Sequence, residues 1–413
     1  MKTKFQVSTS MPAPYACIRA QRGVSLIELM IAIVIAGLIA LGLTQIFAAS
    51  SATSRMTEGL SRVQENGRFA TQFLQRQLRM VGYMGCGADT GRIVQQSFVN
   101  HLAEFDANVP GGNNVPDGNA YRFQRPIEAY TTGAMTAPAE LDTIAGIVDG
   151  SDVLIVRVLT EESTPVVSVT KAADTLNVLV GDPAAAFLPA PNDTVLFGME
   201  NCRSADVFAG SLNGSTPGSL LVVPGRTSPN VYLDPSVSDC GTAPCPWDFR
   251  ISNAFLNARP LVGESSLNAE VHRAEYYAFF VKTNPAGIPS LYMLRFERDS
   301  TALGDPEELV EGVENMQLRF GMDTDVRPDG RVDVYQTAAD VVAGAGSEVA
   351  LDAAWSRVMS VRIGMLIRSP DRAGATDQPH TVIDVNVTPT ANDGAIREVY
   401  ETTVALRNRL FKS

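Results

Sequence analysis

The feature that most constrains this chain is one apolar run near the N-terminus that contains a single carboxylate. No polar side chain occurs from Leu29 to Leu43, and the apolar character continues to Phe47. About 20 such residues form a helix long enough to cross roughly 30 Å of hydrocarbon. The run therefore predicts a membrane span, residues 24–48. Glu28, at its start, is either a functional group or a tolerated carboxylate that reaches the headgroups.

The residues just before the apolar run form a short signature. Arg22 and Gly23 directly precede Val24, and Glu28 is the fifth residue counted from Val24. In a secretory signal the small residue at the cleavage site follows the apolar segment, whereas here the small residue, Gly23, precedes the apolar segment. This order resembles the type IV prepilin signature. The resemblance implies a leader of residues 1–23, cleavage between Gly23 and Val24 by a prepilin peptidase, methylation of the new N-terminus, and a role for Glu28 in subunit assembly.

The charge distribution places most of the chain outside the cytoplasm. Residues 1–23 contain four basic residues and no acid, and the positive-inside rule assigns that side to the cytoplasm. From Val24 onward, the remaining 29 of the 33 basic residues accompany 45 acidic ones, a net charge of −16. Such acidity argues against a general nucleic-acid binder, and we expect no direct nucleic-acid partner. The composition, 45% hydrophobic and 19% charged, indicates a globular body.

Four cysteines follow the predicted leader: Cys86, Cys202, Cys240 and Cys245. An even number in an exported domain predicts a disulfide framework, and four cysteines allow three connectivities. Closure of Cys240 with Cys245 around the turn-forming GTAP segment would leave Cys86 to pair with Cys202. The other two connectivities stay open.

Beyond the span, apolar side chains recur at steps of three, four or seven residues, which is one face of a helix. They are Met56, Leu60, Val63, Ala70, Leu74, Leu78 and Val81. We therefore predict one helix from the membrane to about Met80, with residues 49–82 as its amphipathic half. Glycines 82, 85 and 87 are expected to end it. Residues 83–413 form the predicted exported head.

The head shows mainly strand patterns. Strands are predicted at 152–159, 164–170, 176–181, 193–199, 274–282, 290–297, 359–367 and 383–387. A short helical turn at 309–316 is predicted to lead into a further strand at 316–320. Residues 87–150 and 209–266 are rich in Gly, Asn, Ser and Pro and predict loop insertions. The fold class is α+β, a long N-terminal helix packed on an antiparallel sheet.

Several head segments resemble those of PilW-type minor pilins. They are residues 82–86, 201–208, 313–325, 355–369 and 402–409. The resemblance implies a non-enzymatic subunit of the bacterial inner membrane with its head in the periplasm. It also implies a priming complex at the pilus tip with other minor pilins, the major pilin and the inner-membrane assembly platform. Twitching motility, adhesion or DNA uptake would depend on this complex. The resemblance also implies that Cys86 pairs with Cys202.

We find no sequence motif for catalysis. The three histidines are far apart and match no zinc spacing, and no nucleophile or phosphate-binding motif occurs. One acidic cluster, Asp323, Asp325, Asp329 and Asp333, has the oxygen ligands that calcium prefers. It lacks the spacing of an EF-hand, and an acidic hairpin turn is the alternative interpretation. We expect no cofactor, with calcium as the one candidate.

Two other functions remain as alternatives. A minor pseudopilin of type II secretion would share the N-terminal signature, and its genomic neighbours would distinguish it. A pilus-tip adhesin would use the loops at 87–150 and 209–266 to bind a ligand. Its purified head should then bind that ligand, whereas the head of an assembly subunit should bind only other pilins.

Overall fold

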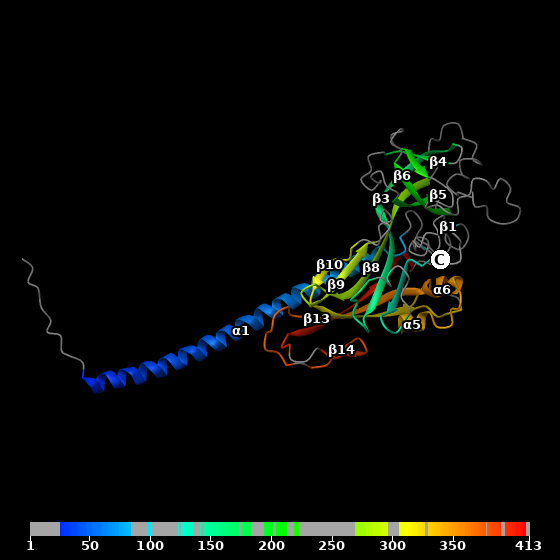
Figure 1. The fold of residues 1–413 in the computed structure, drawn as a ribbon. Coiled ribbons are helices and arrows are strands. Elements are labelled where there is room, and N and C mark those ends of the chain that lie inside the picture. Colours follow the sequence, from blue (N-terminus) through cyan, green and yellow to red (C-terminus); the bar gives the residue numbers. More distant parts are fainter. Residues whose placement is uncertain are drawn as a thin grey trace, which may run out of the picture. The chain divides into compact units, whose positions relative to one another are not determined.

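The computed structural model describes residues 25–83, 98–100, 123, 125–135, 141, 144–172, 175–182, 194–200, 204–212, 219–222, 269–295, 305–326, 329–376, 378–389 and 393–409. The chain divides into two compact units, residues 1–55 and 56–413. The longest element is helix α1, Leu26–Met80, drawn in blue in Figure 1. It ends where the sequence predicted, and Gly82 follows in the left-handed conformation with φ of 75°.

The second part of α1 packs on the head through one face. The buried residues recur at steps of three and four: Gly59, Val63, Gly67, Ala70, Leu74 and Leu78. Met56, which the sequence pattern placed on this face, is instead 55% exposed. Hydrogen bonds join the helix to the head at three levels. Asn66 Nδ2 donates to the Glu311 carbonyl at 2.9 Å, Gln75 Nε2 to Thr402 Oγ1 at 2.6 Å, and Asn408 Nδ2 to the Arg79 carbonyl at 3.4 Å.

A ten-stranded sheet forms the larger part of the head (Figure 1). Its strands are β1 (Phe98–Asn100), β2 (Ile127–Thr131), β3 (Asp152–Ala172), β4 (Thr175–Val180), β5 (Thr194–Glu200), β6 (Ser204–Leu212), β7 (Ser219–Val222), β8 (Ala269–Thr283), β9 (Pro289–Arg295) and β10 (Glu307–Glu311). The order is β10-β9-β8-β5-β6-β7-β4-β3-β2, with β1 added to β6 as a parallel strand. Because β3 also pairs with β8, strands β8, β5, β6, β7, β4 and β3 close a ring.

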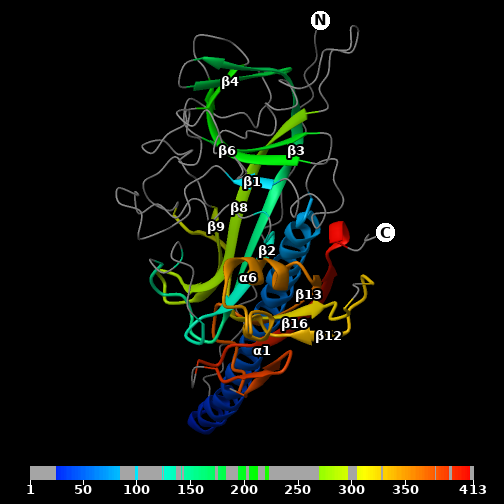
Figure 2. The same cartoon turned by 90° about the vertical axis from the view of Figure 1, so that its right-hand side faces the viewer.

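Strands β3 and β8 connect the two ends of this sheet, as Figure 2 shows. Leu154 and Val156 on β3 face the core that includes the buried face of α1, while Val153 and Ile155 face a second core. Strand β8 is apolar on both faces for the same reason: each face packs against one of the two cores. This agrees with its prediction as a central strand. The sequence predicted two strands at 152–159 and 164–170, but β3 is one strand. Its pairing with β8 shifts register between Leu159 and Ser163, a local bulge that does not end the strand.

A four-stranded antiparallel sheet lies on the other side of the first core. Its order is β12-β11-β13-β16, with bounds Val334–Gln336, Val313–Met322, Val358–Arg368 and Arg397–Ala405. The two sheets are joined by Asp152, whose Oδ2 accepts from the Leu318 N–H at 2.7 Å. The helical turn predicted at 309–316 is wrong. Gly312, with φ of 86°, separates β10 from β11 there, so the apolar residues lie on two different strands.

Three short helices complete this part of the chain: α5 (Ala338–Val341), α6 (Glu348–Trp355) and a 3₁₀ turn, η1 (Arg407–Arg409). Thr337 caps α5 by accepting from the Asp340 N–H, and Ser347 caps α6. Trp355, at the end of α6, is buried edge-on against Phe320 with ring centroids 5.0 Å apart. None of these helices was predicted from the sequence.

The hairpin β14 (His380–Val382) and β15 (Val385–Val387) covers part of the four-stranded sheet. The sequence predicted one strand over 383–387, but Ile383 is in a turn with φ of 58°. This conformation is rare for a β-branched residue and is held by specific contacts. The Ile383 N–H donates to Glu401 Oε1 at 2.8 Å, and its side chain occupies space that a Cβ at Gly364 would fill, at 2.7 Å.

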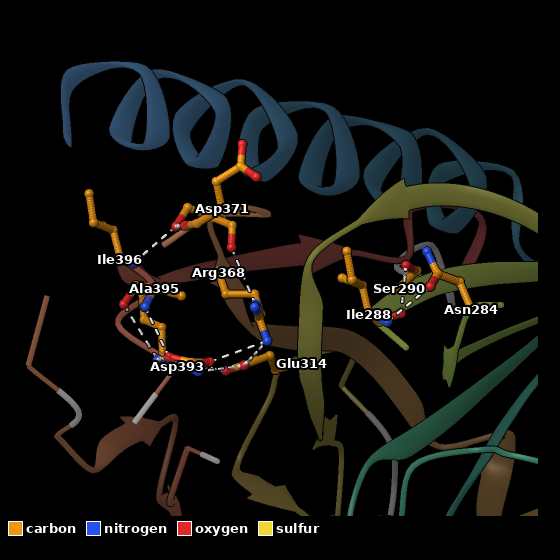
Figure 3. A network of polar contacts seen from close by, with 11 residues as sticks. Asn284, Ile288, Ser290, Glu314, Arg368, Asp371, Asp393, Ala395 and Ile396 are labelled. Atoms are coloured by element: carbon orange, nitrogen blue, oxygen red, sulfur yellow. Dashed lines mark hydrogen bonds and ion pairs between the residues drawn. The ribbon is translucent and has the colours of Figure 1, made fainter. Parts of the chain in front are cut away.

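Buried ion pairs link segments that are far apart in the sequence. Figure 3 shows Glu314, Arg368 and Asp393 converging below a stretch of helix. Arg397, whose side chain is 2% exposed, donates to Glu314 Oε2 at 2.7 Å and also pairs with Asp393. A second group comprises Glu128 on β2, Arg125 just before β2, Arg157 on β3 and Asp352 on α6. Burial raises the pKa of Glu128, but the charges of Arg157 and Arg125 outweigh it and lower the pKa overall.

Candidate assembly surface and acidic turn

The first part of α1 has exposed apolar side chains throughout. Among the large ones from Leu26 to Phe47, the exposed fraction runs from 50% at Leu43 to 76% at Leu26. The helix is long and apolar enough to cross a membrane by length and composition. So much apolar surface in water is unfavourable, and it requires either lipid or other apolar helices around it.

The hydroxyl groups at the end of this apolar part bond within the helix itself. Thr44 Oγ1 donates to the Leu41 carbonyl at 2.8 Å, and Thr53 Oγ1 donates to the Ala49 carbonyl at 2.9 Å. In an apolar environment a polar group without a partner costs several kcal/mol, so internal bonds of this kind make the segment compatible with a membrane.

Glu28 lies in the first turn of α1 and its carboxylate bonds to the helix start. The Ser25 N–H donates to Glu28 Oε2 at 3.3 Å. This is the glutamate half of a capping box, in which an acid at the third helical position accepts from the N-cap amide. The acid also lies at the positive end of the helix dipole. Gly23 and Val24, the predicted cleavage residues, lie outside the described part of the chain, so that prediction stays a prediction.

The acidic turn after β11 brings together three of the four predicted aspartates. Carboxylate oxygens of Asp323, Asp325 and Asp333 lie within 4.8 Å of one another. Asp323 is buried and accepts from the Gly330 N–H at 2.7 Å and the Asp325 N–H at 3.3 Å. Asp329 is not in this group, and its Oδ1 accepts from the Arg331 N–H at 2.9 Å.

Two of these carboxylates have opposite electrostatic environments. The charge of Asp333 raises the pKa of Asp325. A hydrogen bond from the Thr324 N–H, 2.7 Å from Asp333 Oδ2, lowers the pKa of Asp333. Backbone N–H groups thus hold Asp323 and Asp333 in the turn, which is what Asp does in such loops without any ion. Calcium binding remains a prediction.

Other candidates from the sequence have structural positions or lie outside the described residues. His272 is buried in β8 with Nδ1 3.0 Å from the Thr160 carbonyl, and burial lowers its pKa. His380 lies in β14. The cysteines at 86, 202, 240 and 245 and His101 are all outside the described residues, so the predicted disulfides stay predictions.

Comparison with protein families finds two matching segments. Residues 18–44 match the prokaryotic N-terminal methylation motif. Residues 278–408, from β8 to η1, match the type IV pilus-assembly protein W family. These two segments are thus similar to a PilW-family type IV pilin with a prepilin-type motif, which confirms the resemblance noted in the sequence. No curated protein and no solved structure shows a significant match.

Proposed function

We propose that this chain is a minor pilin that helps to initiate type IV pilus assembly as part of a priming complex at the tip. The observation that carries the proposal is α1: one continuous helix from Leu26 to Met80 with a bare apolar first part and a head packed on its second part. A helix of this kind can exchange lipid for the helices of neighbouring subunits. The matches to the methylation motif and the PilW family support the same role.

In this proposal Glu28 acts in assembly. Cleavage before Val24 creates a charged amine next to the apolar helix. A carboxylate near a neighbour's amine lowers the cost of placing both charges in an apolar filament core. The bond from the Ser25 N–H holds the carboxylate until that exchange, and one such exposed bond is weak.

The proposed setting is the bacterial inner membrane, with the head in the periplasm before assembly and at the cell surface afterwards. Prepilin peptidase would process the chain, and other minor pilins, the major pilin and the assembly platform would be its partners. Twitching motility, adhesion or DNA uptake would depend on the resulting pili. The proposal assigns the chain no catalytic step.

Glu28→Ala tests the proposal at native expression level. Leader cleavage and the melting temperature of the head should be unchanged, while co-purification with other minor pilins and the number of surface pili should fall. The matched control is Glu161→Ala, an exposed glutamate in β3. Normal piliation of the Glu28 variant would show that the carboxylate is only tolerated at the interface.

Deletion of the whole chain tests the priming role itself. Pili should be few in the deletion strain, and loss of retraction should restore some of them because rare initiation events would then persist. Full piliation in the deletion strain would contradict the proposal. Normal piliation with defective protein secretion would favour a pseudopilin.

A further inference from the structure

Strand β16 lies at the edge of the four-stranded sheet, and its pairing shows which of its backbone groups point outward. Among the strands that the structure describes, β13 is its only neighbour. The Leu406 N–H donates to the Met359 carbonyl, in register with the pairs of β16 and β13. Because bonded residues alternate in an antiparallel ladder, the even-numbered residues of β16 bond to β13. The groups that point away from the sheet belong to Val399, Glu401, Thr403 and Ala405.

This edge is open and regular. Within the described ranges, none of these four N–H groups has a hydrogen-bond partner. The pairing with β13 has no register shift, and the strand contains no proline or lysine. Glu401, Thr403 and Ala405 are exposed. Natural edge strands are usually protected by a bulge, a proline or a lysine. Without these devices, β16 offers a template to which one more strand can be added.

A stripe of side chains on α1 lies beside the β16 edge. Gln75 of this helix bonds to Thr402 Oγ1 at 2.6 Å, and a Cβ at Gly67 would lie 2.4 Å from the Tyr400 ring. The side chains that share a face with Gln75 recur at steps of three and four residues. We call them the side stripe of α1: Gln64, Arg68, Thr71, Gln75 and Arg79.

The side stripe and the end of β16 carry positive charge that the head does not neutralise. Arg68, Arg79 and Arg407 are exposed, and none forms an ion pair with a residue that the structure describes. In the same part of the chain, Thr71 Oγ1 is buried without a hydrogen-bond partner. In a chain of net charge −12, three unpaired arginines around one strand edge attract an acidic ligand.

The acids of β16 leave most of this charge uncompensated. Glu401 pairs with Arg362 at 2.7 Å, on the face of the sheet that the β14–β15 hairpin covers. Glu398 accepts from the Tyr400 hydroxyl at 3.0 Å and has no arginine partner among the described residues. Three arginines thus face one uncompensated carboxylate. Charge complementarity therefore favours an acidic occupant over a basic one.

We propose that the β16 edge and the side stripe bind an extended acidic segment of a partner protein. The segment adds a strand to the sheet through the outward groups of Val399 to Ala405, and its side chains on the helix side meet Arg68 and Arg79. These arginines are eleven residues apart, which is about 16 Å of helix or roughly five residues of strand. Only even separations keep side chains on one face of a strand, so two carboxylates about four residues apart fit both arginines.

A second copy of this chain fits the same edge poorly. Antiparallel pairing of two β16 strands would continue the sheet across a two-fold axis. Both side stripes would then lie on the same face, with the arginines of one copy facing those of the other. The edge and the stripe are both within residues 56–413, so a partner can bind whether or not the apolar part of α1 is assembled with other subunits.

The experiment measures binding of labelled short peptides to the full chain in detergent by fluorescence anisotropy. The probe is the capped peptide TSEVTVEST, whose two glutamates lie on one face of a strand. TSKVTVKST, with lysines in their place, should bind about tenfold more weakly. Two N-methylated forms of the probe, one on odd-numbered and one on even-numbered residues, test the edge itself. One should lose binding and the other keep it, because only one edge of an added strand bonds to β16.

The variant Arg68→Glu/Arg79→Glu should weaken binding of the glutamate probe about tenfold and favour the lysine peptide. The matched control is Arg62→Glu, an exposed arginine of the same helix that lies about 120° around the axis from Arg68 and should leave binding unchanged. Thr403→Pro removes an outward N–H without removing a bond to β13, so it should weaken binding of both peptides. Far-ultraviolet circular dichroism of each variant should match wild type.

Three results would each overturn the inference: no binding of the glutamate probe, equal binding of the two peptides, and an equal effect of both methylated forms. Dimerisation of the full chain that Thr403→Pro abolishes, without peptide binding, would also overturn it and would identify a second copy as the occupant. Pilus counts in the deletion strain do not depend on peptide binding, so failure of this contact and failure of the proposed pilin function can be told apart.

Discussion

Replacing Asp393 with Asn should destabilise the head at neutral pH and have little effect near pH 2. Asp393 Oδ1 accepts from the Ala395 N–H at 2.9 Å and from Arg397 Nη1 at 2.9 Å, and Oδ2 lies 3.2 Å from Arg368 Nη1. Burial raises the pKa of Asp393, but the bonds from Arg397 and Ala395 and the arginine charges outweigh it and lower the pKa to about 2.

The magnitude follows from the linkage between protonation and folding. The ordinary pKa of an aspartate in this series is 3.8, and the folded value is about 2. The side chain is 16% exposed, so solvent screening is limited. One pKa unit corresponds to 1.36 kcal/mol, so the ionised carboxylate contributes about 2 kcal/mol at pH 7. Because the folded pKa is depressed, this contribution is present above pH 3.8 and falls below about 0.5 kcal/mol near pH 2.

The assay is thermal unfolding of the full chain in detergent at pH 7 and near pH 2, followed by near-ultraviolet circular dichroism. Asp393→Asn should lower the melting temperature by about 3 °C at pH 7, because the unfolding entropy of a head of this size is roughly 0.7 kcal/mol/K. The control is Asp371→Asn, because the Asp371 carboxylate bonds to none of the residues that the structure describes. An equal difference between wild type and Asp393→Asn at both pH values would refute the reasoning.

Three further predictions concern the turn before β11, the cysteines and the acidic turn. Gly312→Ala should cost about 2–4 kcal/mol, because φ is 86° and the new Cβ would lie 2.5 Å from a backbone oxygen. Gly287→Ala, at φ of 80° with open space, should cost only about 1 kcal/mol in the same melts. Peptide mapping without reduction should find Cys86 linked to Cys202, a bond worth roughly 4–5 kcal/mol in the entropic model; a free Cys86 would contradict this. Calcium should raise the melting temperature little or not at all, and a rise that Asp325→Ala abolishes would disprove that expectation.

The features of the fold that sequence could predict are those that depend on local periodicity. The buried face of α1, which contains Val63 and Leu74, could be predicted because the helical spacing of its apolar residues persists over many turns. The strand at 358–368 could be predicted because apolar and other residues alternate along its length. The errors lie where one backbone conformation breaks a pattern. Gly312 separates two strands that together imitate a helical spacing, and Ile383 turns the chain within an alternating run.

The site was predictable to a lesser degree, because its contacts join residues that are distant in the sequence. The acidic turn spans only eleven residues, and three of its four aspartates do converge. The pair of Glu314 with Arg397 joins residues 83 positions apart, and no spacing rule predicts it. The N-terminal motif was recognisable because it is a contiguous signature.

The way α1 joins the head has a mechanical consequence. Under the proposed function, a filament that pulls on this helix would load the joint along the helix axis. The bonds from Asn66, Gln75 and Asn408 lie at successive levels of that axis, and the buried face from Val63 to Leu78 runs between them. A force in this direction shears these contacts together, because it acts parallel to the helix and all of them join the side of the helix to the head. The head therefore resists traction along the helix far better than a force that lifts the helix sideways from Met80.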